Sequence, residues 1–132
     1  MTSDELIVVA AAIVERDERF LLTQRLKGTH LAGTWEFPGG KCEPGESLEA
    51  CLARELMEEL AVQCVVGRSI LVTRHAYPER TVELHFFATT LAGDPAPQLG
   101  QAMRWASRAE LGTLPFPEAD RELIQLLIAR PD

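Results

Sequence analysis

The chain has few cysteines, no long apolar run and no excess of basic residues. Its three cysteines, Cys42, Cys51 and Cys64, are odd in number and show no Cys-x-x-Cys spacing. This pattern argues against a disulfide framework and a structural zinc site, and it predicts reduced, partly buried thiols. The longest apolar run, residues 6–14, is too short to cross a bilayer, and residues 1–5 lack the basic start of a signal peptide. We therefore expect a cytoplasmic protein with no membrane partner.

The net charge limits the class of partner. The 132 residues carry a formal net charge of −7. Proteins that bind nucleic-acid polymers cluster Lys and Arg against the phosphates, so the acidic balance argues against that class. A small polyanion is still possible if divalent cations lie between the two negative partners. The charge therefore favours a small-molecule ligand over a nucleic acid.

The pattern of apolar residues predicts one α/β (α+β) domain, with a mixed β-sheet covered by helices in an α/β/α sandwich. Two helices are expected, from Ser47 to about Ala61 and over residues 118–129. We expect the second strand to be the hairpin partner of the first, around a turn at 15–18, and we expect Pro38-Gly39-Gly40 to form another turn. The expected strands are residues 6–14, 19–25, 65–75, 81–91 and 103–106, with a short extended piece at 35–37.

The first predicted helix has two chemically different faces. At about 100° per residue, Leu52, Leu56, Leu60, Ala53 and Met57 fall on one arc, which we expect to be the core face. The roughly opposite arc carries Glu55, Glu58 and Glu59 within one turn. Like charges at this spacing destabilise a helix, and the only nearby cation on the helix is Arg54. Three carboxylates within reach of one another suit a hard cation such as Mg²⁺. On the second predicted helix, the expected core stripe is Leu123, Ile124, Leu127 and Ile128.

The segment before this helix completes a longer motif. It reads Gly40-x5-Glu46-x7-Arg54-Glu55-Leu56-x-Glu58-Glu59-x-Ala61-Val62. This stretch resembles the Nudix box, G-x5-E-x7-R-E-U-x-E-E-x-G-U, in which U is an apolar residue. Six of the seven fixed positions match, and both U positions are apolar. The chain is thus identified as a single Nudix hydrolase domain spanning residues 1–132, with its box at 40–62.

The resemblance extends beyond the box to the MutT type, which sanitises nucleotide pools, through Leu31 to Lys41, Tyr77 to Arg80 and Phe116 to Asp120. It implies a cofactor, Mg²⁺ or Mn²⁺, held by the carboxylates of the box and by the carbonyl of Gly40. It implies that Arg54 orients these carboxylates, with Glu46 as its ionic partner. It also implies the following roles: Glu55, Glu58 and Glu59 as metal ligands, Arg25 on a substrate phosphate, Phe37 in the base pocket, Arg80 at its border, and Asp120 on the base edge.

The sequence departs from the family pattern at two positions. Ala61 replaces a glycine that typically ends the helix with positive φ, so we expect this helix to end in another way. Leu99 stands where members of this type often carry a carboxylate in the loop before the last strand. The water-activating step is therefore expected to fall on the carboxylates of the helix.

The resemblance implies hydrolysis of a nucleoside triphosphate to the monophosphate and pyrophosphate, by a monomer or homodimer. An ionised Asp120 offers two acceptors to guanine's N1–H and 2-amino group, which favours 8-oxo-dGTP. A protonated Asp120 would instead suit CTP or 5-methyl-dCTP. The residues also leave open a substrate such as a nucleotide sugar or dinucleoside polyphosphate, and a non-catalytic Nudix-fold nucleotide-binding module. The three histidines show no ligand spacing, and they are given no role.

Overall fold

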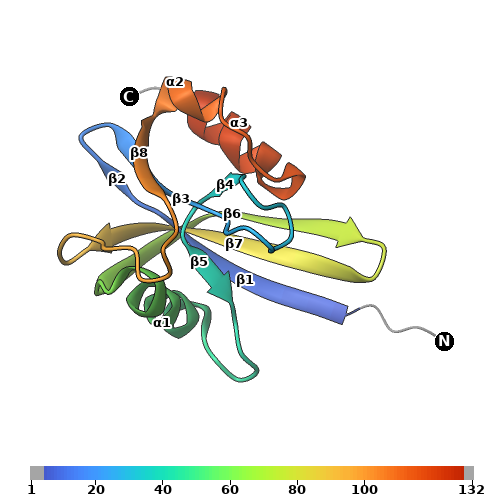
Figure 1. The fold of residues 1–132 in the computed structure, drawn as a ribbon. Helices are drawn as coiled ribbons and strands as arrows, with labels where there is room; N and C mark the ends of the chain where they lie inside the picture. The colour runs from blue at the N-terminus through green and yellow to red at the C-terminus, as the bar shows by residue number, and fades with distance from the viewer. Residues whose placement is uncertain (1–4, 130–132) are drawn as a thin grey trace.

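The computed structural model describes residues 5–129, which form two β-sheets flanked by helices (Figure 1). The prediction about a signal peptide rests on residues that lie almost wholly outside this range. The strands are β1 (Glu5–Ile13), β2 (Glu15–Arg16), β3 (Arg19–Gln24), β4 (Trp35–Glu36), β5 (Gly39–Lys41), β6 (Cys64–Tyr77), β7 (Arg80–Leu91) and β8 (Met103–Ser107). The helices are α1 (Leu48–Leu60), α2 (Arg108–Leu111), the 3₁₀ turn η1 (Glu118–Asp120) and α3 (Arg121–Ala129).

The larger sheet has the order β5-β1-β7-β6 and is mixed. Strand β1 runs parallel to β7 and antiparallel to β5. Side chains of β1 alternate between two apolar clusters: Ala10 and Ala12 pack with α1, whereas Ala11 and Ile13 pack with α3. In Figure 1, α1 lies on one side of this sheet and α2 and α3 lie on the other. The predicted mixed sheet in an α/β/α sandwich is confirmed.

The predicted N-terminal hairpin forms only beside its turn. Residues Glu15–Arg16 extend it as β2, which pairs antiparallel with β3, and Leu21 N–H donates to the Val14 carbonyl at 3.0 Å. The rest of the prediction was wrong, because β3 joins a second sheet with β2, β4 and β8 instead of pairing with β1. The partners of β1 are distant in sequence, and local periodicity carries no information about them. Gly39 and Gly40 form β5 rather than a turn, with Ala11 opposite Gly39. A Cβ at Gly39 would collide with the carbonyl of Ala10, so this close strand pairing requires glycine.

Helix α1 begins as predicted and ends differently. The Ser47 hydroxyl accepts a hydrogen bond from Ala50 N–H at 3.1 Å, which caps the first turn. Ala61 adopts the left-handed conformation, with φ 52°, and its N–H donates to the carbonyl of Met57 at 3.0 Å. The expectation that the helix avoids this conformation was wrong, because the C-cap bond offsets a steric cost of about 1 kcal/mol.

The buried face of α1 is narrower than predicted. Leu52, Leu56 and Leu60 are fully buried, together with Cys51, whereas Ala53 and Met57 are exposed. These last two residues lie at the edge of the arc, beyond the reach of the sheet.

The C-terminal part differs in detail from the single predicted helix. It contains the short α2, then η1, then α3. Leu123, Ile124 and Leu127 are buried as expected, but Ile128 is 44% exposed, so it lies outside the core stripe. Within residues 5–129, no helix is both long enough and apolar enough to cross a membrane.

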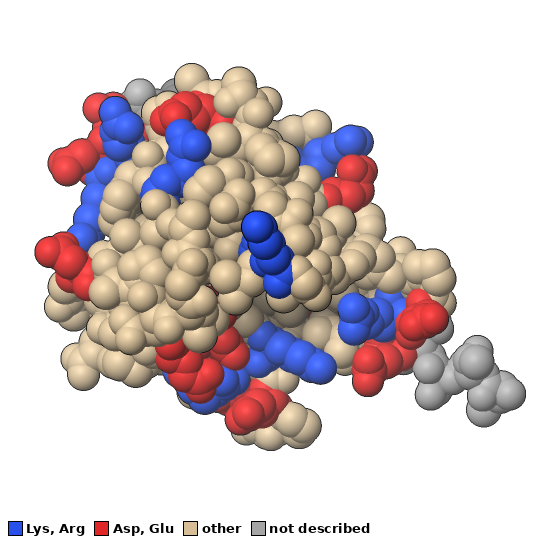
Figure 2. All heavy atoms as spheres, in the orientation of Figure 1, with Lys and Arg blue, Asp and Glu red and all other residues tan. Residues whose placement is uncertain are grey.

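Charged side chains of both signs are spread over the face shown in Figure 2. Lys and Arg side chains on this face lie among Asp and Glu side chains, with uncharged surface between the groups. For the described residues visible in this view, the positive charges do not merge into one broad patch. The described part of this face therefore has mixed charge.

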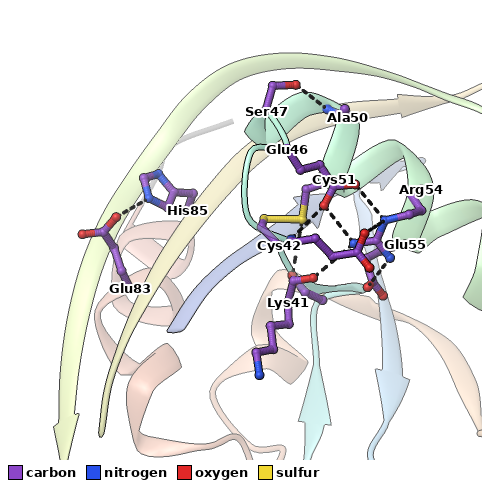
Figure 3. Close-up of a disulfide and its surroundings, with 12 residues drawn as sticks. Lys41, Cys42, Glu46, Ser47, Ala50, Cys51, Arg54, Glu55, Glu83 and His85 are labelled. Carbon is purple, nitrogen blue, oxygen red and sulfur yellow. Dashed lines mark hydrogen bonds and ion pairs between the residues drawn. A yellow bond between two sulfur atoms is a disulfide. The ribbon is translucent and has the colours of Figure 1, made fainter. Parts of the chain in front are cut away.

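The prediction of three reduced thiols was also wrong. Cys42 and Cys51 form a disulfide, and Cys64 is free. Figure 3 shows the bridge joining the segment after β5 to helix α1. Their Cα atoms lie 5.2 Å apart because α1 packs against β5, and nothing in a spacing of nine residues indicates that contact.

Candidate active site

A cavity of about 450 Å³ opens on the α3 side of the larger sheet. Its apolar floor is formed by β1 and β7, through Val9, Ala11, Leu84 and Phe86. Carboxylates of α1 line one end, and η1 lines the other. The cavity therefore combines an acidic end with an apolar end that contains one buried acid.

The acidic end is built where α1 crosses β5. Glu55 and Glu59 are one turn apart and both line the cavity, next to Gly40. A Cβ at Gly40 would collide with the Glu55 carboxylate, so the glycine lets this carboxylate lie directly against the β5 backbone. Glu58 is turned away from the cavity lining, and its two oxygens accept hydrogen bonds from Arg54 at 3.3 Å.

Arg54 connects the helix to the loop before it. Its Nε and Nη2 atoms donate to the two carboxylate oxygens of Glu46 at 2.8 and 2.9 Å, a bidentate pair. Its Nη1 donates to Glu55 at 3.0 Å, and its Nη2 also donates to the carbonyl of Lys41 at 3.2 Å. Figure 3 shows these contacts beside the disulfide. Arg54 thus holds Glu55 in place, and Glu46 holds Arg54, which is the arrangement that the Nudix box implies.

Protonation of these acids depends on their surroundings. Burial raises the pKa of Glu59 to about 8, and the negative charges of Glu55 and Glu36 add to this rise. Burial also raises the pKa of Glu55, although Arg54 opposes the effect. The hydrogen bond from Arg54 lowers the pKa of Glu46 to about 2, helped by the Glu43 N–H. Glu55 and Glu59, which line the cavity, therefore hold their protons more readily than ordinary carboxyl groups, whereas Glu46 stays ionised beside Arg54.

The donor set fits a hard divalent cation. Glu55 and Glu59 offer carboxylate oxygens, and Gly40 contributes the carbonyl of the adjoining strand, an all-oxygen set of the kind that Mg²⁺ prefers. In the described range 5–129, no three Asp, Glu, His or Cys side chains are grouped as a ready-made metal site. The candidate metal site thus consists of the carboxylates of Glu55 and Glu59 and the backbone carbonyl of Gly40. Glu58 lies outside it, hydrogen-bonded to Arg54.

The other end of the cavity is lined by aromatic and apolar side chains and one buried acid. Phe37 is buried, stacks on Phe116 with ring centroids 5.7 Å apart and meets Phe86 edge-on at 6.4 Å. Asp120, only 7% exposed, lines this end, and the exposed Arg80 lies at the mouth. Burial raises the pKa of Asp120 to about 7, with a further contribution from Glu36 and opposition from Arg25.

Arg25 lies at the cavity wall in an ion pair that the sequence did not indicate. Its Nη1 donates to Glu36 at 3.0 Å, and its Nε donates to the carbonyl of His30 at 2.6 Å. Burial raises the pKa of Glu36, while Arg25 opposes the rise. The Nudix box does not include Glu36, and the sequence assigns it no role, although Glu36 and the following Phe37 both line the cavity.

Further residues of the cavity mouth were also missed. His30 and Tyr77 meet edge-on at 5.9 Å, and both line the cavity together with Lys41. His75 contacts the same tyrosine ring at 4.6 Å. These residues lie on a loop and on the ends of distant strands, so only the tertiary structure brings them together.

Leu99, in place of the loop carboxylate, lines a second cavity of about 160 Å³ beside Glu59. The loop is fastened to the end of α1, because Gln98 N–H and the Gln101 amide both donate to the Glu59 carbonyl, at 2.9 and 3.2 Å. The Gln101 oxygen accepts from Leu99 N–H at 2.8 Å. An apolar side chain thus replaces an acid in a loop that still reaches the site.

Comparison with known proteins agrees with this geometry. The model of the NUDIX domain matches residues 9–126, most of the chain. The chain belongs to the Nudix hydrolase family. Among curated Nudix relatives, the CTP pyrophosphohydrolase of Escherichia coli is 37% identical over 126 residues, which are 95% of this chain and 93% of that protein. The 8-oxo-dGTP diphosphatase of Haemophilus influenzae is 34% identical over 95% of this chain and 94% of its own length.

Solved structures show the same Nudix fold. The solution structure of the E. coli ORF135 protein is 38% identical, with a TM-score of 0.79 over 96% of this chain and 89% of that one. The crystal structure of a MutT protein from Methanosarcina mazei is 25% identical, with a TM-score of 0.85 over 96% of both chains.

Proposed function

We propose that this Nudix hydrolase is a MutT-type nucleoside triphosphate pyrophosphohydrolase, with Mg²⁺ or Mn²⁺ as its cofactor. One observation carries the proposal: Glu55 and Glu59 line one end of a cavity whose other end has the Phe37 ring and Asp120. A nucleotide has the matching polarity, with charged phosphates at one end and a flat base at the other. The partner is thus a small molecule, handled in the cytoplasm by a monomer or homodimer.

At the acidic end, the chain's own residues would hold the divalent ion and keep its carboxylate ligands oriented. Glu55, Glu59 and the Gly40 carbonyl would hold the divalent ion. Glu58, hydrogen-bonded to Arg54 in this structure, would be a further ligand. When bound, such an ion offsets the charge of the phosphates and acidifies a coordinated water. Arg54 keeps Glu55 fixed through its bidentate bond to Glu46, and this pre-organisation lowers the cost of assembling the site.

Hydrolysis also requires a proton acceptor and a positive charge near the phosphates. Because Leu99 supplies no carboxylate, a carboxylate oxygen of Glu58 or Glu59 would take the proton of the attacking water. Arg25 at the cavity wall would contact a phosphate oxygen. The products would be a nucleoside monophosphate and pyrophosphate.

The first candidate for the base is 8-oxoguanine. An ionised Asp120 presents two acceptor oxygens, which match guanine's N1–H and 2-amino donors, and 8-oxoguanine keeps both. The relative from H. influenzae is named an 8-oxo-dGTP diphosphatase. Phe37, stacked with Phe116, would border the ring.

A second candidate is cytosine, in CTP or 5-methyl-dCTP. The raised pKa of Asp120, about 7, leaves a large neutral fraction at physiological pH. A neutral carboxyl donates from O–H and accepts at C=O, which matches cytosine's N3 acceptor and 4-amino donor. The relative with 37% identity is named a CTP pyrophosphohydrolase, which agrees with this second candidate.

The test is a panel of 8-oxo-dGTP, dGTP, CTP and 5-methyl-dCTP with Mg²⁺, comparing kcat/KM and identifying products by phosphorus NMR. We expect monophosphate and pyrophosphate, with 8-oxo-dGTP preferred. Preference for the two pyrimidines would move the assignment to the second candidate. Tight binding without turnover of any nucleotide would indicate the non-catalytic module instead. Turnover of nucleotide sugars or dinucleoside polyphosphates in place of the triphosphates would contradict the proposal.

A further inference from the structure

Two cavities meet at one wall beside the acidic end of the site. The larger, about 450 Å³, and the smaller, about 160 Å³, are both lined by Arg25, Glu36 and Glu59. Because Glu59 belongs both to this wall and to the acidic end, phosphates held at the acidic end would lie close to the wall. The position of the Arg25 guanidinium therefore bears directly on how the phosphates lie.

Arg25 is held on two sides and open on a third. Its Nε donates to the His30 carbonyl at 2.6 Å and its Nη1 donates to Glu36 at 3.0 Å. Within residues 5–129, its Nη2 has no hydrogen-bond partner. The backbone of Arg25 also makes two hydrogen bonds. Its N–H donates to the Thr34 carbonyl at 2.9 Å, and its carbonyl accepts from the Gly33 N–H at 3.1 Å. The arginine thus starts a loop, residues 25–34, that folds back on itself.

Glu36 differs from this loop because it belongs to the sheet. It lies in β4, opposite Thr23 of β3, and its neighbour Trp35 donates its N–H to the Pro115 carbonyl at 2.8 Å. A side chain on a paired strand is a firmer anchor than a carbonyl in a loop such as that of His30. Both Arg25 and Glu36 are about one-third exposed, so the pair lies at the cavity wall rather than on the open surface.

We propose that Glu36 is a positioning residue, which holds the Arg25 guanidinium in the wall between the two cavities so that its open side meets the substrate's phosphates. This inference rests on the proposed function, which provides those phosphates. The sequence motif does not include Glu36, and an ordinary surface pair of this type contributes only about 0–1 kcal/mol to stability. The pair serves the reaction instead, because its arginine borders the acidic end.

The variants Glu36→Ala, Glu36→Gln, Arg25→Ala and the double variant Arg25→Ala/Glu36→Ala test this role. Loss of the anchor should lower kcat/KM of Glu36→Ala about 10- to 100-fold, with most of the loss in kcat, since small misplacements of a phosphate ligand have effects of this size. Glu36→Gln should recover most of the activity, because its amide oxygen can accept the same bond from Arg25. In the Arg25→Ala background, Glu36→Ala should change kcat/KM little, since the residue acts through the arginine.

A matched control is available on the larger sheet. Glu83 forms an ion pair with Arg74 at 2.7 Å, and neither residue lines either cavity. Glu83→Ala should leave kcat/KM unchanged, and unfolding temperatures of all variants show whether a loss of activity reflects a loss of structure.

Binding of a non-hydrolysable α,β-methylene analogue of dGTP, measured by calorimetry, separates this inference from the proposed function. If the wild type hydrolyses triphosphates but Glu36→Ala is harmless, or equally harmful with and without Arg25, the positioning role is wrong and the function stands. If the wild type binds the analogue but hydrolyses none of the nucleoside triphosphates, the proposed function is wrong. The same non-additive loss of affinity in the variants would then still support the role of Glu36. Failure to bind and to hydrolyse would contradict both.

Discussion

Breaking the bond between Cys42 and Cys51 removes a covalent link between the segment after β5 and helix α1. The two cysteines are nine residues apart, and the chain-entropy relation for closing such a loop gives about 2.6 kcal/mol of stabilisation at 25 °C. For a chain of 132 residues, a loss of this size lowers Tm by about 9 °C. The change should also loosen Gly40 relative to Glu55. Cys42 lies two residues after Gly40, and Cys51 lies four residues before Glu55.

The assay compares thermal unfolding of the oxidised protein, the protein with a phosphine reductant, and the Cys42→Ala variant. Reduction isolates the cross-link, because it leaves both sulfurs in place. Cys64→Ala is the matched control and should keep the full response to reductant, since Cys64 is the free thiol. Titration of the unfolded oxidised chain should find one thiol, rising to three after reduction. Three thiols before reduction, or an unchanged Tm after it, would refute the reasoning.

Three further predictions concern the site. Glu59→Gln should lower kcat at least about 100-fold by removing a metal ligand and acid–base group, while a Tm measurement shows an intact fold; near-wild-type turnover would contradict the role. Asp120→Asn should be more stable than the wild type at pH 8, because the pKa of Asp120 rises from the usual 3.8 to about 7 on folding. Between these two pH values, the unfolding free energy of the wild type falls by about 1.4 kcal/mol per pH unit relative to that of the variant. Urea unfolding from pH 4 to 9 checks this, and a pH-independent difference would rule it out. Because Arg54 lowers the pKa of Glu46 to about 2, this pair stabilises the folded wild type above pH 4.5, and the stabilisation is lost as pH falls towards 2. Glu46→Gln should abolish this contribution, and identical acid unfolding of both proteins would be the contrary result.

Much of the fold was predictable because its signals are local. Helix α1 has a capping serine and a leucine stripe, and β6 and β7 are long runs joined by a short turn. The pairing of β1 with β5 and β7 was not predictable, because partners far apart in sequence leave no trace in local periodicity. The disulfide was missed for the same reason: it depends on α1 packing against β5.

The site divides in a similar way. Glu46, Arg54 and Glu55 were predicted from fixed spacings within one motif, and the structure places them in hydrogen-bond contact. Glu58 lies against Arg54 rather than in the cavity, a rotamer choice that spacing does not determine. Glu36 comes from another strand, and its importance is visible only once Arg25 is seen beside it.

The central claim is that Glu55, Glu59 and the Gly40 carbonyl hold a divalent ion that joins an acidic protein to a triphosphate. A crystal grown with Mn²⁺ and a non-hydrolysable nucleotide tests it most directly through the anomalous signal of manganese. The account predicts an ion about 2.0–2.3 Å from oxygens of these residues and next to the phosphates, with the base near Phe37 and Asp120. An ion found only elsewhere, or a nucleotide bound with its phosphates away from Glu55 and Glu59, would contradict the account.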